Sequence, residues 1–202
     1  PYEPCPANPI LSHFNKEMQN SPIQGLGHAD LVEGTDGSWW MICLGYRTSG
    51  YLQHVMGRET FLAPVRWDKG AWPVVNGNGT IQLEMDCKTL PQVPMPEEIS
   101  LDHFDNSEMQ LFWSYICNPD TVNYSLKERK SFLRMRASGV SIDSLGSPTF
   151  IGRRQTELNF QATTCLDVNG LKEGDEAGII AYAARLNHYE VQVTCRNGSR
   201  YV

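Results

Sequence analysis

The sequence lacks three features that would define its class at once: a long apolar run, an excess of positive charge and closely spaced cysteines. No stretch approaches the roughly 20 apolar residues that a membrane-spanning helix needs, so no membrane partner is expected. The net charge is −6, which argues against a nucleic-acid partner because phosphate binding needs clustered Lys and Arg. None of the six cysteines forms a C-x-x-C pair, so a zinc or redox motif is not expected.

Helical periodicity is also scarce, apart from a turn near residues 15–19. The Gly/Asp-rich break at 34–37 separates two β-rich runs, 29–33 and 38–44, and predicts a hairpin. The second run is continuously apolar, as in a strand buried on both faces. The pattern predicts an all-β protein, with further strands at 60–67, 80–85, 110–116, 131–136, 149–154, 159–168, 176–183 and 189–195.

Cysteines and sequons bear on the environment of the protein. Cys43 and Cys117 lie in apolar, strand-like runs and are expected to be buried thiols. The sequence holds three N-x-S/T sequons, at Asn78, Asn123 and Asn197, which permit secretion without establishing it. A secreted or extracellular location is therefore favoured. Because the chain opens on Pro1 rather than Met, it is expected to be a mature product or an excised fragment.

A proline-rich stretch divides the chain. Pro91, Pro94 and Pro96 remove backbone donors and hold the chain extended, as in an interdomain linker. The predicted division is residues 1–87, a linker at 88–98, and a second domain at 99–202. The alternative is a long surface loop within one domain.

Two clusters offer candidate binding residues. Gly25 and Gly27 let the backbone turn sharply, which would present His28 at the mouth of a strand. Gly57 precedes Arg58 in the same way, and an arginine fork can bridge a carboxylate and a sugar hydroxyl. Gln24 and Glu59 accompany them. The structural alternatives are a satisfied histidine at His28 and a surface ion pair between Arg58 and Glu59.

Tryptophans could supply flat faces for sugar rings, although tryptophans in strands mostly fill cores. The residues concerned are Trp39, Trp40, Trp67 and Trp72.

Taken together, these motifs resemble the later part of the catalytic domain of glycoside hydrolase family 43, most of all its β-xylosidases and α-L-arabinofuranosidases. The matching segments are residues 3–11, 22–24, 27–31, 57–60 and 72–76. Past the linker, residues 124–129, 132–134 and 147–155 resemble the β-sandwich appended to those enzymes. The resemblance implies the last part of a five-bladed β-propeller followed by a concanavalin-like sandwich, the sandwich cut short at residue 202.

The resemblance also implies a mechanism. The family hydrolyses the glycosidic bond with inversion, using an Asp base, a second Asp and a Glu acid. All three belong to earlier propeller sequence and match nothing here, so neither Asp30 nor Glu59 takes their place and this chain alone is expected to be inactive. His28 resembles the histidine at the pocket floor, and Arg58 the arginine that contacts the sugar. In some relatives that histidine helps to hold a hydrated calcium ion, and no other cofactor is implied.

The leading interpretation is therefore part of an inverting exo-glycosidase that releases xylose or arabinose from plant cell-wall polysaccharide. Its expected partners are xylo- or arabino-oligosaccharides and the remainder of the same enzyme. The alternative is a non-catalytic carbohydrate-binding or structural β-sandwich module, because a fold alone does not fix a function.

Overall fold

The computed structural model describes residues 2–15 and 17–202 and divides the chain into two compact units. The first unit comprises Pro1–Met95 with Thr156–Leu158, and the second comprises Pro96–Gln155 with Asn159–Val202. The division after Met95 falls inside the proline-rich stretch. The inclusion of Thr156–Leu158 in the first unit could not be anticipated from the sequence.

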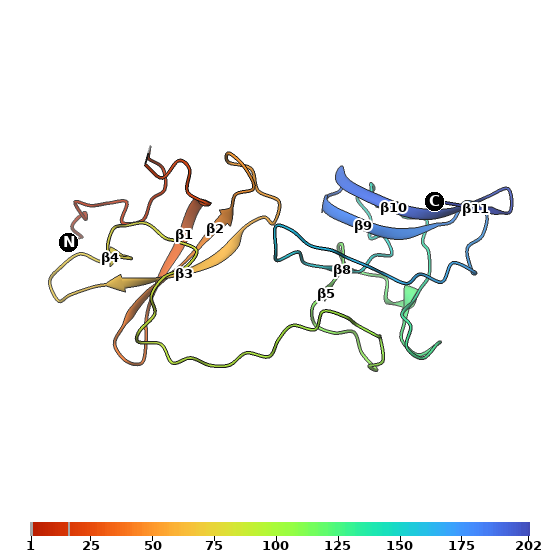
Figure 1. The fold of residues 1–202 in the computed structure, drawn as a ribbon, viewed down its shortest axis with the longest axis horizontal. Coiled ribbons are helices and arrows are strands. Elements are labelled where there is room, and N and C mark those ends of the chain that lie inside the picture. The colour runs from red at the N-terminus through yellow and green to blue at the C-terminus, as the bar shows by residue number, and fades with distance from the viewer. Residues whose placement is uncertain (1, 16) are drawn as a thin grey trace. The chain divides into compact units, whose positions relative to one another are not determined.

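The first unit is built on a four-stranded antiparallel sheet (Figure 1). Its strands are β1 (Ile23–Glu33), β2 (Trp39–Arg47), β3 (Glu59–Arg66) and β4 (Val74–Val75), in the order β1-β2-β3-β4. A sheet of four strands, each paired with the next in sequence, is the arrangement of one propeller blade.

The predicted hairpin joins β1 to β2. The Gly34 N–H donates to the Ser38 carbonyl at 2.7 Å, and the Gly37 N–H donates to the Gly34 carbonyl at 3.0 Å. The Asp36 carboxylate accepts from the Ser38 N–H at 3.0 Å and from the Ser38 hydroxyl at 2.6 Å, and these bonds hold the pKa of Asp36 below its usual value.

One face of this sheet forms the core of the first unit. Because strand residues alternate between faces, Met41 and Cys43 of β2 point the same way as Ala63 and Val65 of β3. Ile81, from the segment after β4, packs into the same cluster. Fully burying a Val, Ile or Met side chain contributes about 1.5–3 kcal/mol.

His13 connects this core to the first strand. The ring is 4% exposed. Its Nδ1 lies 2.7 Å from the Ile23 carbonyl, and the Ile81 N–H donates to its Nε2 over 3.1 Å. A carbonyl accepts and an N–H donates, so the ring carries its proton on Nδ1. His13 is therefore a structural histidine with both ring nitrogens hydrogen-bonded. That role was the structural alternative considered for His28.

The other face of the sheet carries exposed apolar side chains. Val32 of β1, Ile42 of β2 and Leu62 of β3 are 44%, 40% and 44% exposed, and Ile42 pairs directly with Leu62. The continuously apolar β2 was predicted to be buried on both faces. β2 is buried on the face of Met41 and Cys43, whereas on the opposite face Trp40 is 6% exposed and Ile42 is 40% exposed, so that face is covered only in part.

The second unit contains a three-stranded antiparallel sheet and two short strand pairs. Strands β9 (Glu176–Ala184), β10 (Asn187–Arg196) and β11 (Ser199–Tyr201) lie in the order β11-β10-β9. The pair β5 (Trp113–Ser114) and β8 (Gly152–Arg153) and the pair β6 (Tyr124–Ser125) and β7 (Arg134–Met135) complete it. The one helical element among the described residues, η1 (Thr121–Asn123), is a 3-10 turn, and no helix there could cross a membrane.

A partly buried hydroxyl links two segments of the second unit. The Tyr124 hydroxyl donates to the Phe150 carbonyl at 3.1 Å and accepts from the Phe150 N–H at 2.8 Å. Burial raises the pKa of Tyr124.

Several predicted strands are shorter than expected or missing. The expectations at 110–116, 131–136 and 149–154 reduce to two-residue strands, and 80–85 and 159–168 form none. Around Ile81 the backbone donor goes to the His13 ring instead of to a neighbouring strand. An alternating pattern makes a strand only where another strand offers its backbone groups.

The cysteines divide sharply by exposure. Cys43 is 2% exposed, as predicted, and its burial raises the pKa of the thiol. Cys117 was expected to be buried as well, and this is wrong, because it is exposed on a residue with a φ of 58° outside any strand.

We therefore expect thiol-directed labelling of the native chain to modify Cys87, Cys117 and Cys165, which are exposed, and to spare Cys43 until denaturant is added. Mass spectrometry of tryptic peptides after a short iodoacetamide pulse would measure this. Modification of Cys43 as fast as that of Cys87 would contradict the burial described here.

Candidate functional site

His28 lies within β1. The pairing of β1 with β2 shifts register between Gln24 and Gly27 and again between Gly27 and Asp30. At Gly25 the φ is +63°, and an added Cβ would lie 2.1 Å from the Tyr46 ring, so only glycine fits. His28 itself has a φ of 49° and is exposed.

The prediction that His28 stands at the mouth of a strand is therefore wrong. It is the sixth residue of an eleven-residue strand. The glycine-rich segment does not end in a turn but continues its pairing through two irregularities, and such bulges re-aim the side chains beside them.

Arg58 directly precedes β3. Gly57 has a φ of +74°, a conformation that suits glycine, and Arg58 is exposed beyond it. The Glu59 carboxylate binds Arg47 at the end of β2.

His28 lies in β1 and Arg58 directly precedes β3, and β2 lies between these two strands in the sheet. Gly27, Leu44 and Thr60 are in register across the three strands. Two interstrand spacings separate β1 from β3, or about 10 Å.

Gln24 is 6% exposed and faces inward. Its side-chain nitrogen donates to the Met18 carbonyl at 2.8 Å and to the Ser21 carbonyl at 3.1 Å. Both amide donors are thus used to hold the segment that leads into β1.

Arg47 and Glu59 form a two-pronged ion pair that the sequence analysis missed. The Arg47 Nε lies 3.1 Å from each Glu59 carboxylate oxygen, and Nη2 lies 2.9 Å from Oε1. The hydrogen bonds from Arg47 to Glu59 raise the pKa of Arg47. Arg47 Nη2 also donates to the Thr156 carbonyl at 2.7 Å. The pairing of Arg47 with Glu59 follows from the register of β2 with β3. The contact of Arg47 with Thr156 has no sequence signal, because the two residues are 109 positions apart.

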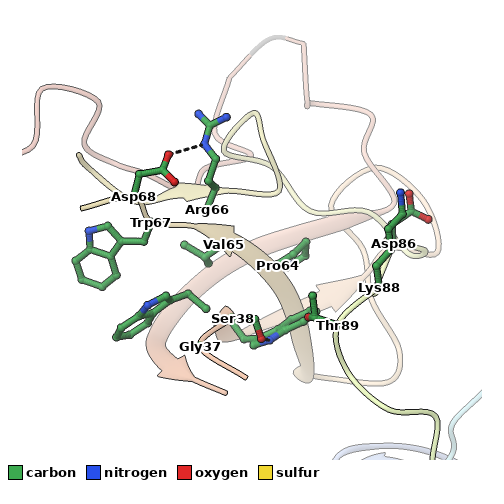
Figure 2. A pocket seen from close by; sticks show the side chains of 12 residues that line it. Gly37, Ser38, Pro64, Val65, Arg66, Trp67, Asp68, Asp86, Lys88 and Thr89 are labelled. Carbon is green, nitrogen blue, oxygen red and sulfur yellow. Dashed lines mark hydrogen bonds and ion pairs between the residues drawn. The ribbon is translucent and has the colours of Figure 1, made fainter. Parts of the chain in front are cut away.

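A hollow of about 510 Å³ lies at the opposite end of β2 and β3. Figure 2 shows Trp67 on one side of it and Asp86 and Lys88 on the other. Trp39 packs edge-on against Trp67 with ring centroids 4.7 Å apart. Neither His28 nor Arg58 lines this hollow.

The four tryptophans of the first unit differ in exposure. Trp40 is 6% exposed and belongs to the packed part of the sheet, whereas Trp67 and Trp72 are 41% and 44% exposed. The Trp67 indole N–H donates to the Ala71 carbonyl at 3.1 Å, which fixes the ring within its own loop.

A calcium ion would need a cage of oxygen ligands. Among residues 2–15 and 17–202, no three His, Cys, Asp or Glu side chains converge on one point. The described residues therefore do not form such a cage by themselves, and a contribution from His28 through a bound water stays a prediction.

The fold defines the class of protein: it is an all-β chain in which a propeller-type sheet precedes a separate β unit. Residues 1–73 match the model of glycosyl hydrolases family 43, and residues 101–202 match the β-xylosidase C-terminal concanavalin A-like domain. The chain therefore belongs to glycoside hydrolase family 43, and the expected fold class is confirmed.

Curated relatives agree along nearly the whole chain. It is 42% identical over 201 residues to the non-reducing end α-L-arabinofuranosidase BoGH43B of Bacteroides ovatus, covering 99% of this chain and 37% of the relative. It is 35% identical to a xylosidase/arabinosidase of Butyrivibrio fibrisolvens, covering 95% of this chain and 37% of the relative. The chain thus spans little more than a third of either relative.

Solved structures of family 43 proteins also match along nearly the whole chain. The Bacteroides ovatus xyloglucan PUL GH43B structure superposes with a TM-score of 0.85 at 39% identity, over 99% of this chain and 39% of that one. The GH43 protein BlXynB of Bacillus licheniformis superposes with a TM-score of 0.80 at 30% identity, over 100% of this chain and 41% of that one.

Proposed function

We propose that the complete protein is an inverting exo-glycosidase that releases xylose or arabinose from plant cell-wall polysaccharide. The observation that carries this proposal is the 42% identity to an arabinofuranosidase across 99% of the chain. Because the chain spans 37% of that relative, the activity is proposed for the complete protein.

The chemistry requires a protonated acid on one side of the scissile bond and a base that activates water on the other. We assign neither role within this chain. The Glu59 carboxylate is occupied by Arg47, and Asp30 lies on β1 opposite the apolar Ile42. This chain by itself is therefore proposed to be inactive, with the three carboxylates supplied by preceding sequence.

His28 and Arg58 are proposed to bind and position the terminal sugar. Both residues are exposed. His28 lies in β1, and Arg58 directly precedes β3. Gln24 and Glu59 act indirectly in this proposal, because their polar groups already hold the chain around the two binding residues.

The remainder of the same enzyme is the proposed partner of the open sheet face. Val32, Ile42 and Leu62 are exposed apolar side chains on β1, β2 and β3, and an adjacent blade of a propeller can cover such side chains. The relatives contain enough additional chain for this, since the matched part is 37% of their length.

Chromogenic aryl β-D-xylopyranoside and aryl α-L-arabinofuranoside would test the proposal. The complete protein is expected to cleave at least one of them, and the 202-residue chain neither. Proton NMR of the first sugar released should show the anomer opposite to that of the substrate. Retention of configuration would refute the inverting mechanism, and binding of xylo-oligosaccharides without cleavage would favour a non-catalytic module.

A further inference from the structure

Arg47, the last residue of β2, contacts two separate segments: the loop from Met56 to Glu59, and Thr156–Leu158. It binds the Glu59 carboxylate with two nitrogens, its Nη2 lies 3.5 Å from the Met56 sulfur, and the same nitrogen donates to the Thr156 carbonyl. Its Nη1 also lies 3.9 Å from Glu157. One planar guanidinium therefore joins the end of β2 to both of these segments.

The strength of this arrangement distinguishes it from an ordinary surface pair. The Arg47 and Glu59 side chains are 24% and 25% exposed. The Arg66–Asp68 pair at the other end of β3 has one contact of 3.6 Å and side chains that are 71% and 73% exposed. Two-pronged geometry with reduced solvent contact gives a strong, directional interaction, whereas exposed pairs contribute little.

Arg58 lies between the two residues of its own loop that Arg47 holds. Met56 is 7% exposed and precedes it, and Glu59 follows it as the first residue of β3. Gly57 turns the chain between them with a φ of +74°. Fixing both sides of a short loop limits where the Arg58 backbone, and hence its side chain, can lie.

We propose that Arg47 is a positioning residue for Arg58, and that it also orders the segment Thr156–Leu158 beside the same loop. The proposal rests on the sugar-binding role proposed for Arg58. Arg47 acts through other residues and does not itself touch the sugar. The Thr156 contact extends its influence to a segment far along the chain, which the structure groups with the first unit.

The test uses Arg47→Met and Arg47→Lys in the complete protein, with Arg66→Met as the matched control on the same sheet. Arg47→Met is expected to lower kcat/KM by about tenfold to a hundredfold, because a displacement of about 1 Å in a positioning contact can have that effect. Arg47→Lys should stay close to Arg47→Met, since a single ammonium cannot reproduce the fork. Arg66→Met should leave kcat/KM unchanged.

A double-mutant cycle with Arg58→Ala distinguishes positioning from a separate contribution. If Arg47 acts through Arg58, Arg47→Met should have little further effect in the Arg58→Ala background. Additive losses, or an unchanged kcat/KM for folded Arg47→Met protein, would overturn the proposal.

Hydrogen exchange provides a readout that does not depend on activity. Arg47→Met should speed exchange in peptides covering 56–60 and 156–158 and leave those covering β9 and β10 unchanged. Unchanged exchange in both peptides would overturn the positioning role. If the complete protein cleaves neither glycoside, the proposed function fails, and the exchange experiment still decides whether Arg47 orders these two segments.

Discussion

Replacement of Arg58 by alanine is expected to lower kcat/KM of the complete protein by about tens to hundreds of fold. A charge-assisted hydrogen bond made in the transition state contributes about 2–3 kcal/mol, and each 1.36 kcal/mol is about tenfold in rate. Initial rates on the aryl glycoside that the wild-type protein cleaves would measure the loss.

Two further variants sharpen this experiment. Arg58→Lys keeps the charge but loses the rigid fork of donors, so we expect it to recover only part of the activity. Arg66→Ala removes an exposed arginine from the far end of β3 and should behave like wild type. Near-normal kinetics for Arg58→Ala would defeat the assignment of Arg58 to the sugar.

The second large effect is expected at His13. Its replacement by alanine leaves the Ile23 carbonyl and the Ile81 N–H without the partners they have now. Each buried unpaired group costs about 1–3 kcal/mol, so the free energy of unfolding should fall by about 2–6 kcal/mol. This is a large share of the roughly 5–15 kcal/mol by which domains are stable.

Urea unfolding of the complete protein would measure this change, with His103→Ala as the control because His103 is exposed. His13→Gln should lose less stability than His13→Ala, since its amide offers both a donor and an acceptor. Equal stability of His13→Ala and wild type would show that neither hydrogen bond matters.

The comparison of Arg58 with His13 shows why exposure matters in choosing candidates. Both residues are polar. A glycine, Gly57, directly precedes Arg58, whereas no glycine adjoins His13. The structure places His13 in the core with both ring nitrogens bonded and leaves Arg58 exposed. We therefore expect His13 to affect stability and Arg58 to affect catalysis.

The sequence by itself determined the all-β class, the long strands and the family. The strands β2, β3, β9 and β10 carry dense apolar or β-branched patterns over eight or more residues. Only residues 29–33 of β1 were predicted as a strand, and the turn at 34–37 joins β1 to β2. Such features are local, so they can be read without knowing the fold. The motifs around His28 and Arg58 pointed to the family for the same reason.

Only the tertiary structure decided which side chains meet. The bulges in β1 that move His28 into mid-strand depend on pairing with β2. The exposure of Cys117 and the absence of a strand at 80–85 depend on which backbone groups find partners. The contact of Arg47 with Thr156 joins positions 109 residues apart. Long-range contacts depend on the packing of the whole chain, and no local pattern in the sequence encodes them.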